Sequence, residues 1–452
     1  MAAFETPRGG RRSRRRFLKT GLGAAAASFV PAHILGLGGE KPPTERLAIA
    51  GIGVGGQGGA DLGNMTSERI VALCDVDWRH AAGTFARFPD ARRFKDFRKM
   101  LDEVKEIDAV VVATPDHAHA VASMAAIRLG KHVYCEKPLT HSVYEARKLA
   151  EAAREAKVAT QMGNQGQASE ETRRLCELVA DGAIGAVTEA HIWTDRPSNG
   201  LFNEYWPQGV DRPRDEPPVP EGLDWDLWLG PAPARPYHPA YHPFRWRGWW
   251  DFGTGALGDI GCHAFDPVFR ALKLGHPTCV EATSTRVNRE TFPLGSMVTY
   301  RFPAREGFPP LKLVWYDGGL RPPRPEAIGQ GVAMGPNGRL LVGDKGVLLG
   351  NRIYPDARRE EYREPPPTLA RSVGHYREWI EASKGGKPAG SNFDWAGPLT
   401  EVVLLGNVAL RVELREKLTQ VRLDWDPAAF RVTSLPEANG FLHREYRAGW
   451  TL

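Results

Sequence analysis

The sequence predicts an α/β protein in which an N-terminal doubly wound parallel sheet of the Rossmann type is followed by a C-terminal α+β domain with a large, mostly antiparallel open-faced sheet. Up to residue 166, near-continuous apolar runs alternate with helical stretches, which is typical of parallel strands buried on both faces. Beyond residue 186 the strand-like runs alternate apolar and polar residues or are rich in β-formers, which indicates an antiparallel sheet with one packed face.

The N-terminal part has a regular βαβα pattern. Strands are expected at residues 46–53, 69–75, 107–115 and 132–138, with 157–166 as the sixth strand. Helices are expected at 116–129 and 141–156. Because strands that alternate with helices form open parallel sheets, we assign residues 45–165 to a single Rossmann domain.

The C-terminal part, residues 166–452, is assigned to a second domain that binds the substrate and forms oligomer contacts. Its β-rich runs lie at 186–195, 278–288, 296–302, 311–317 and 338–350. Helices that would cover the packed face of this sheet are expected at 169–181, 255–273, 373–384 and 396–413.

Residues 193–250 form an arm that is rich in tryptophan and proline and holds seven of the thirteen Trp residues. Long loops in compact domains tend to be functional. Aromatic rings among Asp, Arg and His suit stacking on sugar C–H faces, and Trp250 is assigned to substrate binding on this basis. A structural arm that packs against a second subunit is the alternative, and both can hold.

The first 32 residues have a basic region, a short apolar run and small residues near Val30, which is the layout of a cleaved export signal. The order Ser-Arg-Arg-Arg-Phe-Leu-Lys at 13–19 is similar to twin-arginine signals, which direct folded proteins to the export machinery. Residues 33–44 would be a linker. We expect a periplasmic or extracytoplasmic protein; a disordered basic tail is the alternative.

The charge distribution and the cysteine content argue against a nucleic-acid-binding protein and against a disulfide-bonded protein. The formal charge is +5, but residues 1–32 carry seven basic residues against Glu5, so the remainder is close to −1 and offers no basic surface for nucleic acid. The apolar stretch of the signal is too short for a stable membrane span. The five cysteines are odd in number and form no CxxC pair, so we expect thiols that pack in the core.

The first motif is Gly51-x-Gly53-x-x-Gly56 at the end of the first strand, a pattern that binds a dinucleotide. The first glycine permits a tight turn, the second lets the backbone approach the pyrophosphate, and the third allows close packing of helix on strand. Val54 and Gly55 belong to the same loop. Asp75 follows the second strand, where a carboxylate accepts from the ribose hydroxyls and repels a 2′-phosphate, so NAD is favoured. Arg79 leaves NADP open.

The second and third motifs carry the chemistry. Glu136 and Lys137 end a sheet strand, where an ammonium can stabilise a developing alkoxide; by itself the pair could be a turn with a solvated charge. Asp259 and His263 stand four residues apart on one helix face, so a histidine base can lie beside a carboxylate that orients it. The alternative is that Asp259 and His263 form an ordinary i,i+4 ion pair with no catalytic role. A metal is not expected, although His238 and His242 could contribute to one.

These motifs, in their order, resemble the glucose–fructose oxidoreductase / inositol dehydrogenase (Gfo/Idh/MocA) family. The resemblance rests on five segments: GIGVGG, ATPDHAH, CEKP, GDIGCH and NFDWAGPLTEVVLLGNVALR. It implies a Rossmann domain and an open-sheet domain, and a homo-oligomer, dimer or tetramer. It implies that Lys137, Asp259 and His263 are catalytic. It further implies that Thr114, Pro115 and His119 form the nicotinamide-side loop, that Glu136 and Lys137 contact the cofactor, and that Asn164 and Gln165 meet substrate or nicotinamide.

Three functions follow from these expectations. The first is an NAD(P)-dependent oxidoreductase acting on a sugar, polyol or glycoside, with Lys137 polarising the reacting oxygen and His263 as acid/base. Because an exported protein would meet little free NAD, its cofactor is expected to be tightly held and regenerated internally. The second is an NAD-dependent glycoside hydrolase or lyase that works through a transient keto-sugar. The third is a sugar-binding protein without catalysis.

Overall fold

The computed structural model describes residues 45–198, 203–415 and 421–452. The predicted signal peptide, 1–32, and the predicted linker, 33–44, lie outside these residues. Both sheets belong to one compact unit, Leu47–Leu452. No helix among the described residues has the length and apolar character needed to cross a membrane.

The first sheet contains, within the described residues, six parallel strands in the order β3-β2-β1-β4-β5-β6. The strands are β1 (Ala48–Ile52), β2 (Arg69–Cys74), β3 (Arg92–Phe94), β4 (Ala109–Val112), β5 (His132–Glu136) and β6 (Thr160–Gly163). Its helices are α1 (Gln57–Gly63), α2 (Ala82–Arg87), α3 (Phe97–Glu103), α4 (Asp116–Arg128) and α5 (Val143–Ala156). Every residue of β1 and β4 is buried, which confirms the two-faced burial expected from the apolar runs.

The second sheet contains nine strands in the described ranges, in the order β13-β12-β11-β7-β10-β9-β8-β14-β15. They are β7 (Val187–Trp193), β8 (Cys279–Ser284), β9 (Ser296–Phe302), β10 (Leu311–Tyr316), β11 (Gly338–Gly343), β12 (Gly346–Leu349), β13 (Arg352–Tyr354), β14 (Val421–Asp426) and β15 (Arg431–Val432). β10 runs parallel to β7 and the other pairs are antiparallel, so the predicted mostly antiparallel sheet is confirmed. The run predicted at 338–350 is a hairpin of β11 and β12.

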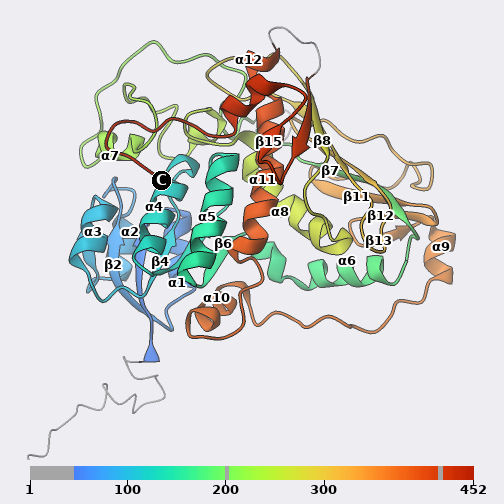
Figure 1. The fold of residues 1–452 in the computed structure, drawn as a ribbon, viewed down its shortest axis with the longest axis horizontal. Coiled ribbons are helices and arrows are strands. Elements are labelled where there is room, and N and C mark those ends of the chain that lie inside the picture. Colours follow the sequence, from blue (N-terminus) through green and yellow to red (C-terminus); the bar gives the residue numbers. More distant parts are fainter. Residues whose placement is uncertain (1–44, 199–202, 416–420) are drawn as a thin grey trace, which may run out of the picture. The chain divides into compact units, whose positions relative to one another are not determined.

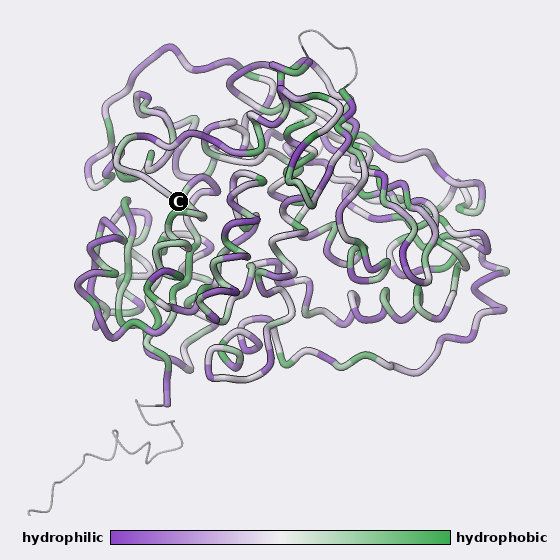
Figure 2. Tube along the Cα trace, in the orientation of Figure 1, coloured by the Kyte–Doolittle hydropathy of each residue, from purple (hydrophilic) through white to green (hydrophobic). Residues whose placement is uncertain are grey.

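The remaining helices are α6 (Glu170–Ala180), α7 (Trp225–Leu229), α8 (Gly255–Leu272), α9 (Asp356–Glu361), α10 (His375–Ser383), α11 (Phe393–Ala409) and α12 (Val412–Arg415). Helix α11 packs between α5 and α8 (Figure 1) and is buried on nearly every side, as its apolar sequence requires. Figure 2 shows the hydrophobic residues along the central strands of the first sheet. Helices therefore close both faces of the first sheet and one face of the second. The other face of the second sheet, expected to be free, is partly covered, because Trp193, Val314 and Tyr316 are buried there with Ile328 from the loop before β11.

The position of α10 differs from the expectation. The sequence pattern places residues 373–384 on the packed face of the second sheet, but α10 packs on the first: Trp379 lies in one core cluster with Ile49 and Tyr134. The cause is the long excursion of the chain after β13, which returns to the edge strand β6 before α11 begins. Amphipathic periodicity identifies a helix, but it does not say which sheet the helix covers.

The second half of the aromatic arm, from residue 223 onward, is held mostly by a core of its own, whereas Trp193 and Trp250 at the two ends of the arm pack in other clusters. Trp228, Tyr241, Trp246 and Trp249 are buried together, and the rings of Trp225 and Trp228 stack 4.5 Å apart. The ring nitrogens of His117, on α4, lie 2.9 Å from the Trp228 carbonyl oxygen and 3.2 Å from that of Phe252. The arm is therefore a packed structural unit anchored on α4, and most of its rings are not free to stack on a ligand.

A buried ion pair joins α5 to α11. Arg147 binds the Glu401 carboxylate through Nε at 2.6 Å and Nη2 at 2.8 Å, and Glu401 is 1 % exposed. We expect Glu401→Ala to lower the free energy of unfolding by about 3–5 kcal/mol, because it leaves a guanidinium largely out of water without its partner. Chemical denaturation measures this loss. The control is Asp394→Ala, which breaks the exposed pair with Arg154 and should change stability little; equal losses in the two variants would contradict the argument.

Candidate active site

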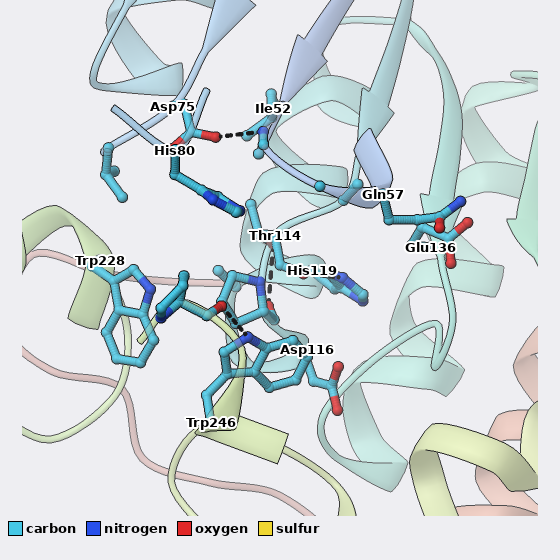
Figure 3. A pocket seen from close by; sticks show the side chains of 18 of the residues that line it. Ile52, Gln57, Asp75, His80, Thr114, Asp116, His119, Glu136, Trp228 and Trp246 are labelled. Carbon is cyan, nitrogen blue, oxygen red and sulfur yellow. Dashed lines mark hydrogen bonds between the residues drawn. The ribbon is translucent and has the colours of Figure 1, made fainter. Parts of the chain in front are cut away.

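A cavity of about 280 Å³ lies at the carboxyl ends of the strands of the first sheet, which is where open α/β sheets bind ligands (Figure 3). Its walls come from the loops that follow β1, β2, β4 and β5, from α8, from the aromatic arm and from the C-terminal residues. Most of the predicted site residues line it. They include Gly53, Gly55, Gly56, Asp75, Thr114, Pro115, His119, Glu136, Lys137, Gln165 and His263.

The glycine loop lies directly against the loop after β4. Gly53 has φ +76°, and a Cβ at this position would stand 2.7 Å from the backbone nitrogen of Thr114. The sequence predicts that the third glycine of the motif, Gly56, allows close packing of helix on strand. In the structure a Cβ at Gly56 would have room, and glycine is favoured there because φ is +58°. The close approach falls on Gly58, where a Cβ would meet the Gly53 carbonyl oxygen at 2.0 Å. The loop leaves space above it for a pyrophosphate.

Asp75 organises this loop from the end of β2. Its Oδ2 accepts from the backbone N–H groups of Val54 at 2.8 Å and Gly55 at 2.9 Å, and its Oδ1 accepts from that of Asp77 at 2.8 Å. Burial raises the pKa of Asp75, and the three N–H donors oppose that rise. Carboxylate oxygens have two lone pairs each, so ribose hydroxyls can still donate to it. Arg79 pairs with the exposed Glu221 at 2.8 Å.

His119 ties two loops of the rim together. Its Nε2 lies 2.8 Å from the Thr114 carbonyl oxygen and its Nδ1 lies 2.7 Å from that of Pro138. Burial by itself would lower the pKa of His119, but Cys135 and the two carbonyls outweigh that effect and the net pKa is raised. The predicted nicotinamide-side loop is thus fixed to the segment that follows Lys137.

Glu136 is the centre of a buried polar cluster beside the cavity. It accepts from Gln165 Nε2 at 2.8 Å and from the Tyr134 hydroxyl at 3.3 Å. Burial raises its pKa to about 7. Asp61, on α1, faces it, and burial together with the Glu136 charge raises the pKa of Asp61 to about 8. Burial and mutual repulsion thus both favour protonation of this pair of carboxyls.

Lys137 lines the cavity and forms a largely buried ion pair with Asp259, which is not itself among the lining residues. Lys137 Nζ lies 2.7 Å from Asp259 Oδ1 and 3.0 Å from the Asp259 carbonyl oxygen, and both side chains are largely buried. Arg247 reaches the same Oδ1 from the arm through Nε at 3.1 Å. Although burial favours the neutral acid, the charges of Lys137 and Arg247 hold the pKa of Asp259 well below its usual range. Lys137 is therefore not a solvated charge on a turn, and one of its N–H bonds remains for a ligand.

His263 lies one helical turn after Asp259 on α8 and lines the cavity. Burial, reinforced by the charge of Lys137, lowers its pKa to about 3, so the imidazole is neutral at ordinary pH. The sequence pattern predicts that Asp259 orients this ring. Among the described residues its carboxylate instead binds Lys137 and Arg247, which orients the ammonium.

Sequence reasoning missed two charged residues of the cavity. Arg247 stands in the arm with its guanidinium over the rings of Phe244 and Trp246, 4.1 and 4.2 Å from their centroids. Asp116 opens α4 within the ATPDHAH segment; it is 2 % exposed and accepts from the Thr254 hydroxyl at 2.6 Å. Burial raises the pKa of Asp116 to about 7. The signal for Asp116 is its place directly after Pro115 at a strand end.

Asp116 gives a testable pH dependence. If its carboxylate accepts a proton during turnover, kcat/KM should rise with pH through about 7, and Asp116→Asn should lose that rise and about 10–100-fold in rate. The Thr254 hydroxyl stabilises the anion, so Thr254→Val should raise the pKa and move the midpoint to higher pH. Rate profiles from about pH 5 to 9, which bracket this pKa, measure both. A Thr254→Val midpoint equal to that of the wild type would contradict the assignment.

Two predicted substrate residues lie elsewhere. Trp250 is outside this cavity: its ring is packed against Phe292, with the Arg411 guanidinium 4.6 Å from its centroid, so it does not offer a free face here. Asn164 is 1 % exposed behind the cavity wall, and its side-chain oxygen and nitrogen have no hydrogen-bond partner among the described residues. Gln165 does line the cavity and donates to Glu136.

The histidines considered for a metal have other partners. His242 Nε2 lies 2.8 Å from Asp77 and His238 Nε2 lies 3.3 Å from Asp215. No group of three or more potential ligands is close enough to hold a metal ion in the part of the chain that the structure describes. All five cysteines, which lie in that part, are free thiols.

Comparison with known families gives two matches. Residues 46–164 match a model described as an oxidoreductase family with an NAD-binding Rossmann fold. Residues 170–302 match the model of the C-terminal alpha/beta domain of the same oxidoreductase family. The two matches together span more than half of the chain and contain Lys137, Asp259 and His263.

Curated relatives align over part of the chain. Inositol 2-dehydrogenase of Rubrobacter xylanophilus is 35 % identical over 155 residues, 33 % of this chain and 44 % of the relative. 1,5-anhydro-D-fructose reductase of Ensifer adhaerens is 38 % identical over 88 residues, 20 % of this chain and 26 % of the relative. Levoglucosan dehydrogenase of Pseudarthrobacter phenanthrenivorans is 25 % identical over 186 residues, 41 % of this chain and 38 % of the relative. The chain thus spans less than half the length of each.

Solved structures share the fold over most of the chain. The WlbA dehydrogenase of Bordetella pertussis, in complex with NADH and UDP-GlcNAcA, has a TM-score of 0.56 at 17 % identity and covers 84 % of this chain and 100 % of its own. GenD2 from gentamicin A biosynthesis, in complex with NAD, has a TM-score of 0.54 at 20 % identity, with 84 % and 97 % covered. At these identities the likeness concerns the fold.

Proposed function

Because the chain belongs to the Gfo/Idh/MocA family of NAD-binding oxidoreductases, we propose that it oxidises a hydroxyl of a sugar, polyol or glycoside with a tightly held dinucleotide that is regenerated in the same site. The observation that carries the proposal is the largely buried ion pair between Lys137, which lines the cavity, and Asp259, 2.7 Å away. This pair supplies a fixed ammonium where an alkoxide would develop.

The residues of the cavity fit NAD. Gly53 lies so close to Thr114 that no Cβ would fit, and because it carries no side chain the backbone of the loop is open to a ligand. Asp75 places a carboxylate at the end of β2. Glu136 and Lys137 would lie at the nicotinamide end. When bound, the nicotinamide ring takes up or returns the hydride of the substrate carbon, and the protein supplies position and electrostatics.

The chain's own residues divide the remaining tasks. The free N–H of Lys137 would donate to the reacting oxygen, while the Asp259 carboxylate holds the ammonium in position. His263 is neutral and can accept the hydroxyl proton, although its low pKa makes it a weak base. Asp116, with a pKa of about 7, is better suited than His263 to act as the proton acceptor at neutral pH.

Purification tests the proposal directly. The protein is isolated without added cofactor, any bound nucleotide is released and identified, and sugars and polyols are then screened for a change in nicotinamide absorbance. We expect about one NAD per chain and an absorbance change that reverses when a keto-acceptor is added. A protein that turns over only with external NAD and releases NADH would contradict internal regeneration.

A second function is favoured by the presence of two proton acceptors, His263 and Asp116, in one cavity. Oxidation of a sugar hydroxyl to a ketone acidifies the neighbouring C–H. A second base can then remove that proton while the glycosidic C–O bond breaks and the leaving oxygen takes up a proton to depart as an alcohol. Water would add to the unsaturated ketone that results, and the hydride taken from the substrate would then return to the ketone carbon. Cleavage of an aryl glycoside without consumption of added NAD would distinguish this function from net oxidation.

Export and assembly are part of the proposal. The basic segment at 13–19 is interpreted as a twin-arginine signal that delivers the folded, loaded protein outside the cytoplasm. Cell fractionation with and without Arg14→Lys and Arg15→Lys tests this route, since loss of both arginines should retain the protein in the cytoplasm. A homo-oligomer is expected, and light scattering of the purified protein measures it.

A further inference from the structure

The C-terminal residues return to the first sheet and reach the cavity. After β15 the chain passes α5 and α7 and ends beside α4 (Figure 1), where Arg128 Nη2 donates to the Leu452 carbonyl oxygen at 2.8 Å. Trp450, two residues earlier, is one of the residues that line the cavity. We name residues 443–452 the C-terminal strap. It lies outside the segments that the two family models match.

Trp450 stands at the end of the cavity opposite to Lys137. Its ring lies 6.0 Å from that of Phe97, the first residue of α3, which follows the strand beside β2. Lys137 follows β5, three strands away from β2 in the sheet order. Because Asp75 ends β2 and a carboxylate there meets the adenosine ribose, Trp450 lies on the side where the adenine base of a dinucleotide would extend.

The strap is fixed by polar contacts to three parts of the protein. Arg447 donates through Nε to the Gly230 carbonyl oxygen at 3.0 Å and through Nη2 to that of Asp226 at 2.7 Å, which joins the strap to α7. The Tyr446 hydroxyl donates to Glu145 on α5 at 2.7 Å. The Arg98 guanidinium lies 4.5 Å from the Trp450 ring centroid. The indole is thus held in place before any ligand arrives.

We propose that the C-terminal strap is a cofactor-binding element in which Trp450 packs against the adenine end of the dinucleotide and slows its release. The inference rests on the proposed function, since it requires NAD as the resident cofactor. Apolar neighbours complete the site: Phe97, Leu227 and Trp228 line the same cavity. Stacking of an aromatic ring on a nucleobase changes affinity by roughly 5- to 150-fold. The contact between the strap and the adenine end would help to retain NAD, although it lies far from the reacting atoms.

The test measures nucleotide release rather than turnover. Wild type, Trp450→Ala and Arg447→Ala are loaded with NAD, desalted, and followed for the half-time of nucleotide loss. We expect both variants to release NAD about ten-fold faster. Trp78→Ala is the matched control, because Trp78 is an exposed tryptophan in the turn after β2 that packs on Phe85 and does not line the cavity. Thermal unfolding without nucleotide checks that the variants are folded.

A truncated ligand locates the contact. Nicotinamide mononucleotide lacks the adenosine part, so Trp450→Ala should weaken binding of NAD and leave binding of the mononucleotide unchanged. Equal weakening of both ligands, or wild-type NAD release in both strap variants, would overturn the inference alone. A wild-type protein that binds no dinucleotide would overturn the proposed function together with it.

Discussion

Replacing Lys137 by methionine is expected to reduce kcat by at least about 1,000-fold while the protein keeps its nucleotide. Methionine is unbranched and of similar length, so the cavity keeps its shape, but the donor for the reacting oxygen is lost and Asp259 keeps only Arg247 as a charged partner. Loss of one preorganised donor in such a site reduces rates by about 100–1,000-fold, and the disturbed ion pair adds to this. Single-turnover rates and the nucleotide content of the same preparation measure the two effects separately.

The control for this variant is Lys105→Met. Lys105 is an exposed lysine paired with Asp102 three residues before it, and its loss should leave both rate and nucleotide content unchanged. Wild-type turnover in Lys137→Met would falsify the assignment of Lys137. Loss of nucleotide with the rate would assign Lys137 to cofactor binding instead.

Gly53→Ala is expected to weaken NAD binding by more than about 100-fold. The residue has φ +76°, which disfavours any side chain by about 1 kcal/mol, and the new Cβ would lie 2.7 Å from the Thr114 nitrogen and 2.8 Å from the Ala113 carbonyl carbon. Backbone cannot yield as a flexible side chain can, so the glycine loop and the loop after β4 must separate. Both of these loops line the cavity, and calorimetric titration with NAD measures the loss.

Gly83→Ala is the matched control. Gly83 lies in α2, and a Cβ added there would meet no neighbouring atom within 4 Å, so alanine should be neutral or slightly stabilising. If Gly53→Ala bound NAD as tightly as Gly83→Ala does, the loop would not be the dinucleotide cradle. Unchanged thermal stability in both variants would show that the effect is local.

The order of the helices and strands could be predicted because each element has its own local pattern of apolar and polar residues. The buried strands of the first sheet are short apolar runs, and the second sheet follows from alternation, so both architectures are confirmed. β3 could not be found in this way: Arg92-Arg93-Phe94 has no apolar run and pairs only along β2. The prediction of the sheet that α10 covers was wrong because helical periodicity carries no information on which partner lies opposite.

The residues of the candidate site could be predicted where a local sequence motif contains them. They could not be predicted where their environment is formed by residues far away in the chain. The glycine loop, Asp75, Lys137 and His263 meet in one cavity, and their roles stay predictions. Asp116 gains its environment from Thr254, 138 residues later, and Arg247 depends on how the arm folds. No local pattern reports such pairings. The assignment of Trp250 rests on residue type alone, and the ring is already packed against Phe292.

The self-contained core of the aromatic arm has a consequence for how substrate choice can change. The arm buries Trp228, Tyr241, Trp246 and Trp249 among themselves and touches the Lys137–Asp259 pair through the guanidinium of Arg247. The arm also reaches the dinucleotide end of the cavity, where Leu227 and Trp228 line it, and its helix α7 anchors the C-terminal strap. A chimaera that carries a different arm should therefore change both the sugar that it accepts and the retention of its dinucleotide.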